Sequence, residues 1–172
     1  MMTWTPAYPE ITISSFTGPE DALAFRLLNE AWISRLFTLT DEDRRVLEQP
    51  VEHIIRPGGD VLLARAEGTR EIVGCVALLS YGDGVFELAK MAVTPSAQGS
   101  GLGHRLVASA LARASELSGR RVFLGTSTRL SAAVHIYEAA GFRRITRSEL
   151  PVEDYYARAD TLMEIGVTPL AA

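Results

Sequence analysis

Apolar positions along the chain fall into runs with two different spacings, and each change of spacing marks a predicted element. Residues 61–67, 71–81 and 85–94 are mostly apolar and are separated by the short glycine-containing segments 68–70 and 82–84. This arrangement is typical of antiparallel strands joined by tight turns. From Leu102 the apolar residues recur at helical spacing as far as Leu117, which predicts a long amphipathic helix. Further strands are expected at 10–16, 120–126, 142–148 and 161–167.

The segment 17–50 is predicted to form two helices. Pro19 suits the first turn of a helix, because the N–H that proline lacks would have no partner there. The first helix has an apolar stripe formed by Phe25, Leu28, Trp32 and Leu36. The acidic residues after Thr40 favour the start of a second helix, which Pro50 closes. A last helix is expected at 130–141, where Gly141 ends it.

The predicted order is strand, two helices, three strands, helix, strand, helix and two strands. Helices interleaved with the strands of one sheet predict an α/β (α+β) fold. We expect a single-domain sandwich in which a mixed, mostly antiparallel sheet of about seven strands carries helices on both faces. The domain is expected to cover residues 10–168, with an N-terminal tail at 1–9 and a C-terminal tail at 169–172.

The amino-acid composition and net charge mainly exclude classes of binding partner. The net charge of −4 argues against a general binder of nucleic acid, and no apolar run reaches the roughly 18 to 20 residues of a membrane helix. We therefore expect a cytoplasmic protein with no nucleic-acid and no membrane partner. Cys75 is the only cysteine and lies in an apolar run, which favours a buried packing role. The histidines have no ligand-like spacing, so no metal is expected.

The segment 90–106, KMAVTPSAQGSGLGHRL, places three glycines directly before the long helix. A Walker loop needs Lys followed by Ser or Thr after its last glycine, and His104 and Arg105 stand there instead. A dinucleotide loop needs Gly-x-Gly-x-x-Gly, which fails when counted from Gly99 and when counted from Gly101. The remaining pattern is Gln-x-x-Gly-x-Gly, whose bare N–H groups at a helix start can receive a pyrophosphate. A tight strand-to-helix turn without a ligand is the alternative.

Two motifs at this spacing carry a family resemblance. MAVTPSAQGSGLG at 91–103 and AVHIYEAAGF at 133–142 together resemble the GCN5-related N-acetyltransferase (GNAT) family. Segments 28–55 and 155–165 are similar to a bacterial branch of small-molecule acetyltransferases. In that family the glycine loop binds the pyrophosphate of acetyl-CoA, and the strand before it offers backbone groups to the pantetheine arm. The resemblance thus implies acetyl-CoA (coenzyme A) as cosubstrate, bound by Met91, Ala92, Val93, Gln98, Gly99, Ser100, Gly101, Leu102, Gly103 and His104.

Two residues are the catalytic candidates. Tyr137 matches the tyrosine that protonates the CoA sulfur in the family; a core tyrosine bonded to a carbonyl is the alternative. Glu87 is a carboxylate in an otherwise apolar strand, where a buried charge is costly without a role or a partner. With a raised pKa it would accept the proton of the acceptor amine, directly or through a water. The alternative for Glu87 is a structural ion pair with Lys90 or an arginine.

The sequence departs from the family pattern in two places. Leu130 stands where many members carry an asparagine that binds the pantetheine arm, and Ser127 or Ser131 would have to substitute. Gly125 stands where members often carry a glutamate that acts as base or substrate ligand, which moves the acid–base work toward Glu87 or a water chain. The resemblance places the acceptor amine between the first helices and the segment before the last strand. The corresponding substrate-binding candidates are Trp32, Arg35, Phe37, Tyr155 and Arg158, beside Tyr156.

The expected function is that of an N-acetyltransferase, an acyltransferase acting on amino groups. It would move an acetyl group to the primary amine of a small molecule by direct attack in a ternary complex. Because arginine suits a carboxylate, an amino acid or similar carboxylated amine is the favoured acceptor. The alternative, kept open by Leu130 and Gly125, is an acetyl-CoA-binding sensor or interaction module with little catalysis. Members of the family often form dimers through their last strands, so the resemblance includes a homodimer among the expected assemblies.

Overall fold

The computed structural model describes residues 9–170, and every structural statement below concerns this range. The tails expected at 1–9 and 169–172 therefore lie mostly outside the described residues. The strands are β1 (Ile11–Ser15), β2 (Asp60–Ala66), β3 (Ile72–Ser80), β4 (Val85–Val93), β5 (Arg121–Thr126), β6 (Arg143–Ile145) and β7 (Thr161–Gly166). The α-helices are α1 (Pro19–Leu36), α2 (Asp41–Glu48), α3 (Leu102–Glu116) and α4 (Ser131–Ala139). Short turns of other helix types occur at Val51–Ile55, Pro95–Ala97 and Arg147–Glu149.

The strands form one mixed sheet in the order β1-β2-β3-β4-β5-β7-β6. The pairs β2·β3 and β3·β4 are antiparallel, which confirms the predicted meander. Within residues 9–170 the parallel pair is β4·β5, and the helix α3 makes the crossover between these strands. The element order and the seven-stranded α/β sandwich agree with the sequence prediction.

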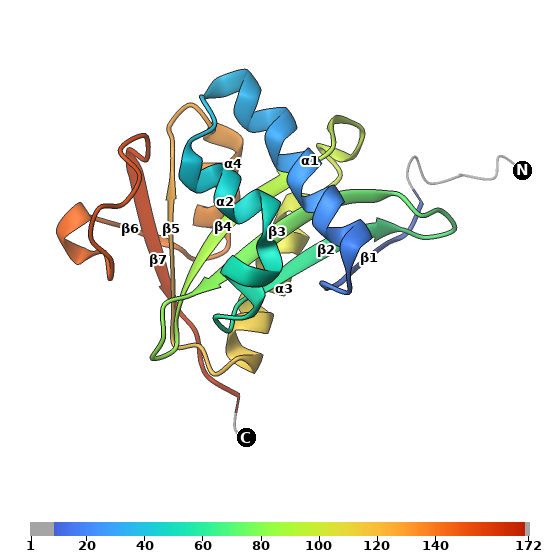
Figure 1. Cartoon of the computed structure of the whole chain (residues 1–172). Coiled ribbons are helices and arrows are strands. Elements are labelled where there is room, and N and C mark those ends of the chain that lie inside the picture. The colour runs from blue at the N-terminus through green and yellow to red at the C-terminus, as the bar shows by residue number, and fades with distance from the viewer. Residues whose placement is uncertain (1–8, 171–172) are drawn as a thin grey trace, which may run out of the picture.

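The helices cover the sheet on both faces, with α1 and α2 on one side and α3 and α4 on the other (Figure 1). Each face has its own apolar cluster. The cluster under α1 and α2 includes Phe25, Ile33, Val46 and Leu47, whereas the cluster under α3 includes Leu106, Val107, Ala110 and Ala114. None of the helices that the structure describes is long and apolar enough to cross a bilayer.

The two long helices bury their faces differently. The stripe predicted for α3 is confirmed, because Leu106, Val107, Ala110 and Ala114 are fully buried. The stripe predicted for α1 is partly wrong, since Leu36 is 37% exposed and the buried positions are Asp21, Phe25, Asn29 and Ile33. The reason is that two polar residues on the buried face have tertiary partners. Arg65 donates to Asp21 at 2.7 Å, and Asn29 donates to the carbonyl of Phe25 at 2.9 Å and to the thiol of Cys75 at 3.4 Å.

The centre of the sheet is split between β4 and β5. These strands pair only at Val85–Glu87 against Arg121–Phe123. Beyond this point β4 continues along β3, and β5 continues along β7, so the two strands diverge (Figure 1). The split opens the sheet between the helices of one face and those of the other. Side chains from both faces can therefore line a common cleft.

A bulge in β4 sits beside this split. The register with β3 shifts between Cys75 and Ala77, so that two residues of β4, Lys90 and Met91, stand against Val76. Lys90 has a φ of 54°, a left-handed conformation that is unfavourable for a residue with a Cβ. Its carbonyl accepts the thiol of Cys75 at 3.6 Å, and Cys75 is fully buried as predicted. The single cysteine thus packs against the bulge.

Candidate active site

A cleft lies in the split between β4 and β5. It receives side chains from α1, from both strands, from α4 and from the long loop between β6 and β7. The lining residues are Trp32, Ile33, Phe37, Glu87, Leu88, Ala89, Lys90, Met91, Gly125, Thr126, Ser127, Leu130, Ala133, Tyr137, Tyr155, Tyr156, Arg158 and Ala159. Both catalytic candidates and four of the five substrate-binding candidates are among them. The exception is Arg35, which is exposed in the last turn of α1 and does not line the cleft.

Glu87 is 2% exposed, so its carboxylate is held away from bulk water. Its Oε1 accepts the hydroxyl of Tyr81 at 3.0 Å, and its Oε2 accepts the hydroxyl of Tyr155. Burial raises the pKa of Glu87, and the two tyrosine hydrogen bonds oppose part of that increase. The ion pair considered as an alternative does not form, because Lys90 pairs with a different carboxylate. Glu87 is therefore a buried carboxylate that binds a proton more readily than an exposed one.

Gly125 explains how Tyr155 reaches that carboxylate. A Cβ at this position would overlap with the ring of Tyr155, so only glycine lets the ring lie over β5. Phe123, which pairs with Glu87 across the two strands, stacks at 5.4 Å from the ring of Tyr81 and at 5.9 Å from that of Tyr155. The departure from the family pattern at Gly125 thus makes room for an aromatic hydroxyl beside Glu87.

Two cations, Lys90 and Arg158, share one buried carboxylate beside the same cleft. Lys90 Nζ lies 2.6 Å from Asp43 Oδ1, and Arg158 donates to both oxygens of Asp43, at 2.8 and 3.0 Å. The side chain of Lys90 is 7% exposed and that of Asp43 is fully buried. These charges hold the pKa of Asp43 well below its usual range, although burial alone would raise it. The sequence analysis did not include Lys90 or Asp43 among the site residues.

Aromatic rings enclose the two cations. Lys90 Nζ lies 5.3 Å from the ring centre of Tyr156, and the guanidinium of Arg158 lies 5.4 Å from the rings of both Tyr156 and Phe37. Arg129 covers Phe37 at 4.9 Å. Cation–π contacts of this kind are stronger where water is excluded. Lys90 and Arg158 therefore line the cleft in positions that their common partner Asp43 holds from behind.

The loop that carries Tyr155, Tyr156 and Arg158 is held at both ends. Arg147 donates to the carbonyls of Tyr155 and Ala159, at 3.2 and 3.0 Å. Asp160 accepts the backbone N–H and the hydroxyl of Thr128, at 2.8 and 2.9 Å, which ties the loop to the segment after β5. The aromatic and cationic side chains of this loop are thus positioned before any ligand enters.

The glycine loop before α3 has the geometry of an open anion site. Gly99 and Gly101 have φ values of 78° and 84°, and a Cβ on either would meet nothing within 4 Å. Gly101 is the N-cap of α3 and no side chain caps the helix, so the N–H groups of its first turn remain available. Gly103 has a different role, because a Cβ there would press against Ile136 of α4 at 2.7 Å. The loop therefore has space and free N–H groups for a pyrophosphate. Gly103 instead allows α3 and α4 to pack closely.

The other predicted cofactor residues lie along this path. Gln98 donates its amide to the carbonyl of Val93 at 3.2 Å. His104 is exposed on the first turn of α3, and its ring centre lies 6.4 Å from that of His135 on α4. Met91 lines the cleft and Ala92 pairs with Cys75 of β3. The residues from 91 to 104 thus run from the cleft to the helix start.

Tyr137 enters the cleft from the other face of the sheet. It lies on α4, is 6% exposed, and its ring is 5.9 Å from that of Phe142. Burial raises its pKa, so its hydroxyl is protonated at neutral pH. Leu130, at the N-cap of α4, and Ser127, which is 5% exposed, also line the cleft. At the position where many family members carry an asparagine that binds the pantetheine arm, this chain thus has the apolar side chain of Leu130, close to the buried Ser127.

Comparison with known proteins identifies a common family. Residues 24–142 match the family model described as "Acetyltransferase (GNAT) family". An uncharacterised N-acetyltransferase of Schizosaccharomyces pombe is 30% identical over 140 residues, covering 77% of this chain and 83% of the relative. An amino-acid acetyltransferase of Ralstonia nicotianae is 34% identical over 115 residues, which is 66% of this chain but only 23% of that protein.

Solved structures show the same fold at lower identity. An acetyltransferase of the GNAT family from Staphylococcus aureus superimposes with a TM-score of 0.82 at 20% identity, covering 91% of this chain and 99% of the other. The N-acetylglutamate synthase of Neisseria gonorrhoeae, complexed with coenzyme A and N-acetyl-glutamate, gives a TM-score of 0.70 at 22% identity. The match covers 92% of this chain and 35% of the synthase.

Proposed function

The chain belongs to the acetyltransferase (GNAT) family, and on that premise we propose that it transfers the acetyl group of acetyl-CoA to the primary amine of a small molecule that carries a carboxylate. One observation carries the choice of acceptor. The buried carboxylate of Glu87, which is able to take a proton, and two cations, Lys90 and Arg158, that share the single buried carboxylate of Asp43 lie at the same cleft. An amine and an acid group on one small molecule match these two features.

The charge of the cluster supports an anionic acceptor. Lys90 and Arg158 supply two positive charges and Asp43 supplies one negative charge, which leaves one positive charge uncompensated. Asp43 uses one of the three N–H donors of the Lys90 ammonium, so this group retains donors for a second acceptor oxygen. A charge that is mostly withdrawn from water binds an opposite charge more strongly than an exposed one does. A single carboxylate on the acceptor would balance the cleft.

Two relatives are named for the same class of molecule, whereas two others are named mycothiol acetyltransferase. The amino-acid acetyltransferase of Ralstonia nicotianae and the N-acetylglutamate synthase of Neisseria gonorrhoeae are both named for carboxylated amines or their products. The present chain spans less than half of either protein, so the acceptor rests on the cleft rather than on these names. An amino acid is the simplest molecule with both groups.

Acetyl-CoA supplies an activated thioester when it is bound. The backbone of residues 98–104 at the start of α3 would hold its pyrophosphate, and the split edge of β4 at Met91, Ala92 and Val93 would hold its pantetheine arm. Glu87 would accept the proton of the acceptor ammonium, which frees the lone pair of the amine. Tyr137 would donate the proton of its hydroxyl to the departing thiolate. Backbone amides of β4 would stabilise the charge on the acetyl oxygen.

A covalent acetyl-enzyme is not part of this proposal. Burial raises the pKa of the Cys75 thiol to about 12, and the thiol donates to the carbonyl of Lys90. A thiol in this state is a poor nucleophile at neutral pH. Direct attack of the amine on the thioester in a ternary complex is therefore the simplest route.

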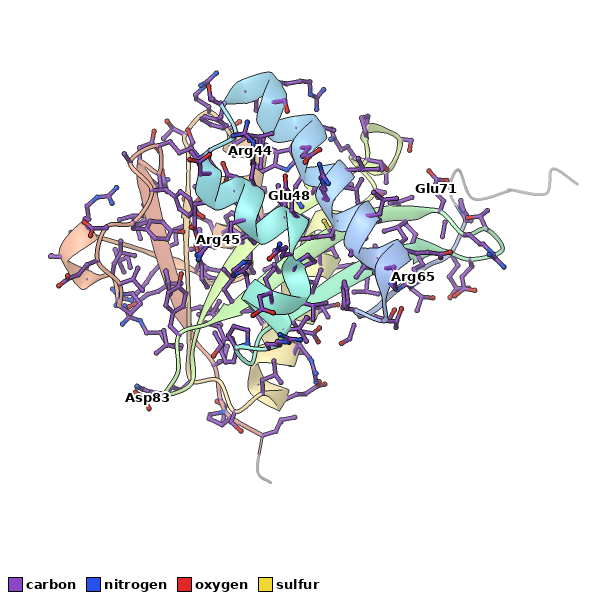
Figure 2. All side chains as sticks on the ribbon, in the orientation of Figure 1. Arg44, Arg45, Glu48, Arg65, Glu71 and Asp83 are labelled. Atoms are coloured by element: carbon purple, nitrogen blue, oxygen red, sulfur yellow. The ribbon has the colours of Figure 1, made fainter. Side chains whose placement is uncertain are left out.

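The test compares a carboxylated amine with its amide. Arg158→Ala should raise the KM for an amino acid by about 10- to 100-fold, because a charge-assisted hydrogen bond is worth roughly 1.5–3 kcal/mol, and should change the KM for the corresponding amino-acid amide much less. Arg44→Ala is the matched control. Arg44 lies on α2 next to Asp43, is exposed, and pairs only loosely with Asp41 at 3.4 Å (Figure 2). Equal losses for the acid and the amide would refute a carboxylate-binding role of Arg158.

A further inference from the structure

The two oxygens of Glu87 are served by tyrosines that face different surroundings. Tyr155 donates to Oε2 and lines the cleft, whereas Tyr81 donates to Oε1 from the end of β3, is 46% exposed and does not line the cleft. Glu87 itself is only 2% exposed, and of the two tyrosines that donate to its carboxylate Tyr155 is the one that lines the cleft. Tyr155 therefore offers a hydrogen-bonded route for a proton from the cleft to Oε2 of Glu87.

We propose that Tyr155 is a catalytic relay, which passes the proton of the acceptor ammonium to Glu87 through its hydroxyl. The inference rests on the proposed function, because it assigns a path to the proton that acetyl transfer to an amine must remove. The geometry carries it: the ring of Tyr155 lies over Gly125, where a side chain would overlap with it, and its hydroxyl meets the buried carboxylate.

The relay balances protons and charges. An N–H bond of the ammonium breaks and its proton forms a new O–H bond at Tyr155 Oη. At the same time the original O–H bond of Tyr155 breaks and its proton binds Glu87 Oε2. The amine and Tyr155 end neutral, and Glu87 ends as a neutral carboxylic acid. The ammonium and the carboxylate thus neutralise each other inside the cleft, where little water is present to stabilise ionised groups.

The two transfers occur together. Burial and the neighbouring carboxylate raise the pKa of Tyr155, so a free phenolate is not populated near neutral pH. The ionised carboxylate of Glu87, whose pKa is raised by burial, is a stronger base than the neutral hydroxyl of Tyr155 and is the final proton acceptor. Tyr155 therefore exchanges one proton for another without becoming charged.

The surroundings of Tyr155 keep the relay in place. Arg147 holds the backbone carbonyl of Tyr155 at 3.2 Å. The ring of Tyr156 lies 5.2 Å from that of Tyr155, and Phe123 packs on its other side at 5.9 Å. The charged groups near Glu87 are Lys90, which lowers its pKa, and Glu42, which raises it. These groups tune the pKa of Glu87, whereas the hydrogen bond to its Oε2 comes from Tyr155.

The test compares Tyr155→Phe with Tyr81→Phe in the full chain. Each variant removes one hydroxyl from the same carboxylate, and each should move the acid limb of the kcat/KM profile to higher pH, because both hydrogen bonds lower the pKa of Glu87. Tyr155→Phe should in addition lower the plateau by about 100-fold, the usual size of a lost proton-transfer group. Tyr81→Phe should lower it by no more than about threefold.

Two further measurements separate a relay from a structural role. In mixtures of H2O and D2O, the wild-type rate should depend on deuterium content along a curve, as two moving protons require, and Tyr155→Phe should give a straight line. Gly125→Ala keeps every hydroxyl but displaces the ring of Tyr155, so it should lose the plateau as Tyr155→Phe does. Melting temperature and coenzyme A affinity report whether each variant is folded. If Tyr155→Phe does not fold, the plateau rate of Gly125→Ala takes its place as the test of the relay.

The outcomes distinguish the two proposals. Equal plateau losses in Tyr155→Phe and Tyr81→Phe, with a wild type that acetylates a carboxylated amine, overturn the relay and leave the proposed function intact. A wild type that binds coenzyme A but acetylates no amine overturns the proposed function and the relay with it. A large loss confined to Tyr155→Phe and Gly125→Ala, with a straightened deuterium dependence, establishes the relay.

Discussion

The ammonium of Lys90 lies 2.6 Å from the carboxylate of Asp43, and this ion pair joins the bulge of β4 to the first turn of α2. Asp43 has a second structural role, because it accepts the backbone N–H of Thr40 at 2.9 Å and completes the capping box of α2. With Arg158 bound to the same carboxylate, three separate segments meet at one buried residue. The positions of Lys90 and Arg158 at the cleft therefore depend on the ionised carboxylate of Asp43.

Replacement of Asp43 by Asn should destabilise the fold strongly. It leaves the cations of Lys90 and Arg158 without their common partner, and breaking a buried pair of this kind costs about 3–5 kcal/mol. The folded pKa of Asp43 lies below its unfolded value, so its contribution is present above about pH 4 and is lost as the pH falls further. Chemical denaturation from pH 7 to pH 3 should show the difference between Asp43→Asn and wild type shrinking.

Asp41→Asn provides the control for this experiment. Asp41 lies in the same turn of α2, but its side chain is fully exposed and its pair with Arg44 is 3.4 Å long. Exposed pairs contribute about 0–1 kcal/mol, so this variant should stay close to wild type. A loss as large as that of Asp43→Asn would contradict the account of the buried cluster.

Glu87→Gln should abolish most of the turnover while preserving or raising stability. The folded pKa of Glu87 is raised, so the ionised carboxylate costs stability above that pKa, and this cost disappears when the pH falls below it. The neutral amide lacks the cost. The melting temperature of Glu87→Gln relative to wild type should therefore rise between pH 5 and pH 8. If the melting temperature of Glu87→Gln relative to wild type is instead lower at pH 8 than at pH 5, Glu87 does not have a pKa raised by burial.

Gly101→Ala should weaken the binding of acetyl-CoA on the order of tenfold, because the added methyl stands on the open side of the loop and the left-handed backbone disfavours a side chain. Gly68→Ala is matched in backbone strain, with a φ of 77° and nothing within 4 Å, but lies in the turn after β2. Isothermal titration should show weaker binding only in the first variant. Equal affinities in both variants would remove the glycine loop from the binding site.

The sequence predicted those parts of the molecule that depend on neighbouring residues. The meander, the stripe of α3 and the glycine loop are each set by residues within one or two elements, and all three are found in the structure. The cleft positions of Tyr155 and Arg158 followed from a family resemblance rather than from a local pattern. Arg35 was placed beside the acceptor by the same resemblance, yet it is exposed and does not line the cleft, whereas Trp32 and Ile33 of the same helix do.

The parts that the sequence did not reveal depend on distant partners. Asp43 reads as an ordinary helix-cap residue, and only the fold brings it to Lys90, 47 residues away. The bulge that turns Lys90 toward Asp43 has no signal in the apolar pattern of β4. Asn29 and Asp21 are polar residues that the predicted apolar stripe of α1 does not include, yet they are buried because their partners Cys75 and Arg65 lie on β3 and β2. Buried polar residues with tertiary partners are therefore what periodicity misses.

The most direct test of the central claim is the release of free thiol from acetyl-CoA across a panel of amino acids, amino-acid amides, polyamines, aminoglycosides and peptide N-termini, with Tyr137→Phe measured alongside. We predict turnover with amino acids or similar carboxylated amines, little with their amides, and a slower rate in Tyr137→Phe while coenzyme A binding is kept. Absence of turnover with every amine, together with a melting temperature that acetyl-CoA still raises, would contradict the enzymatic account and favour a sensor that binds acetyl-CoA.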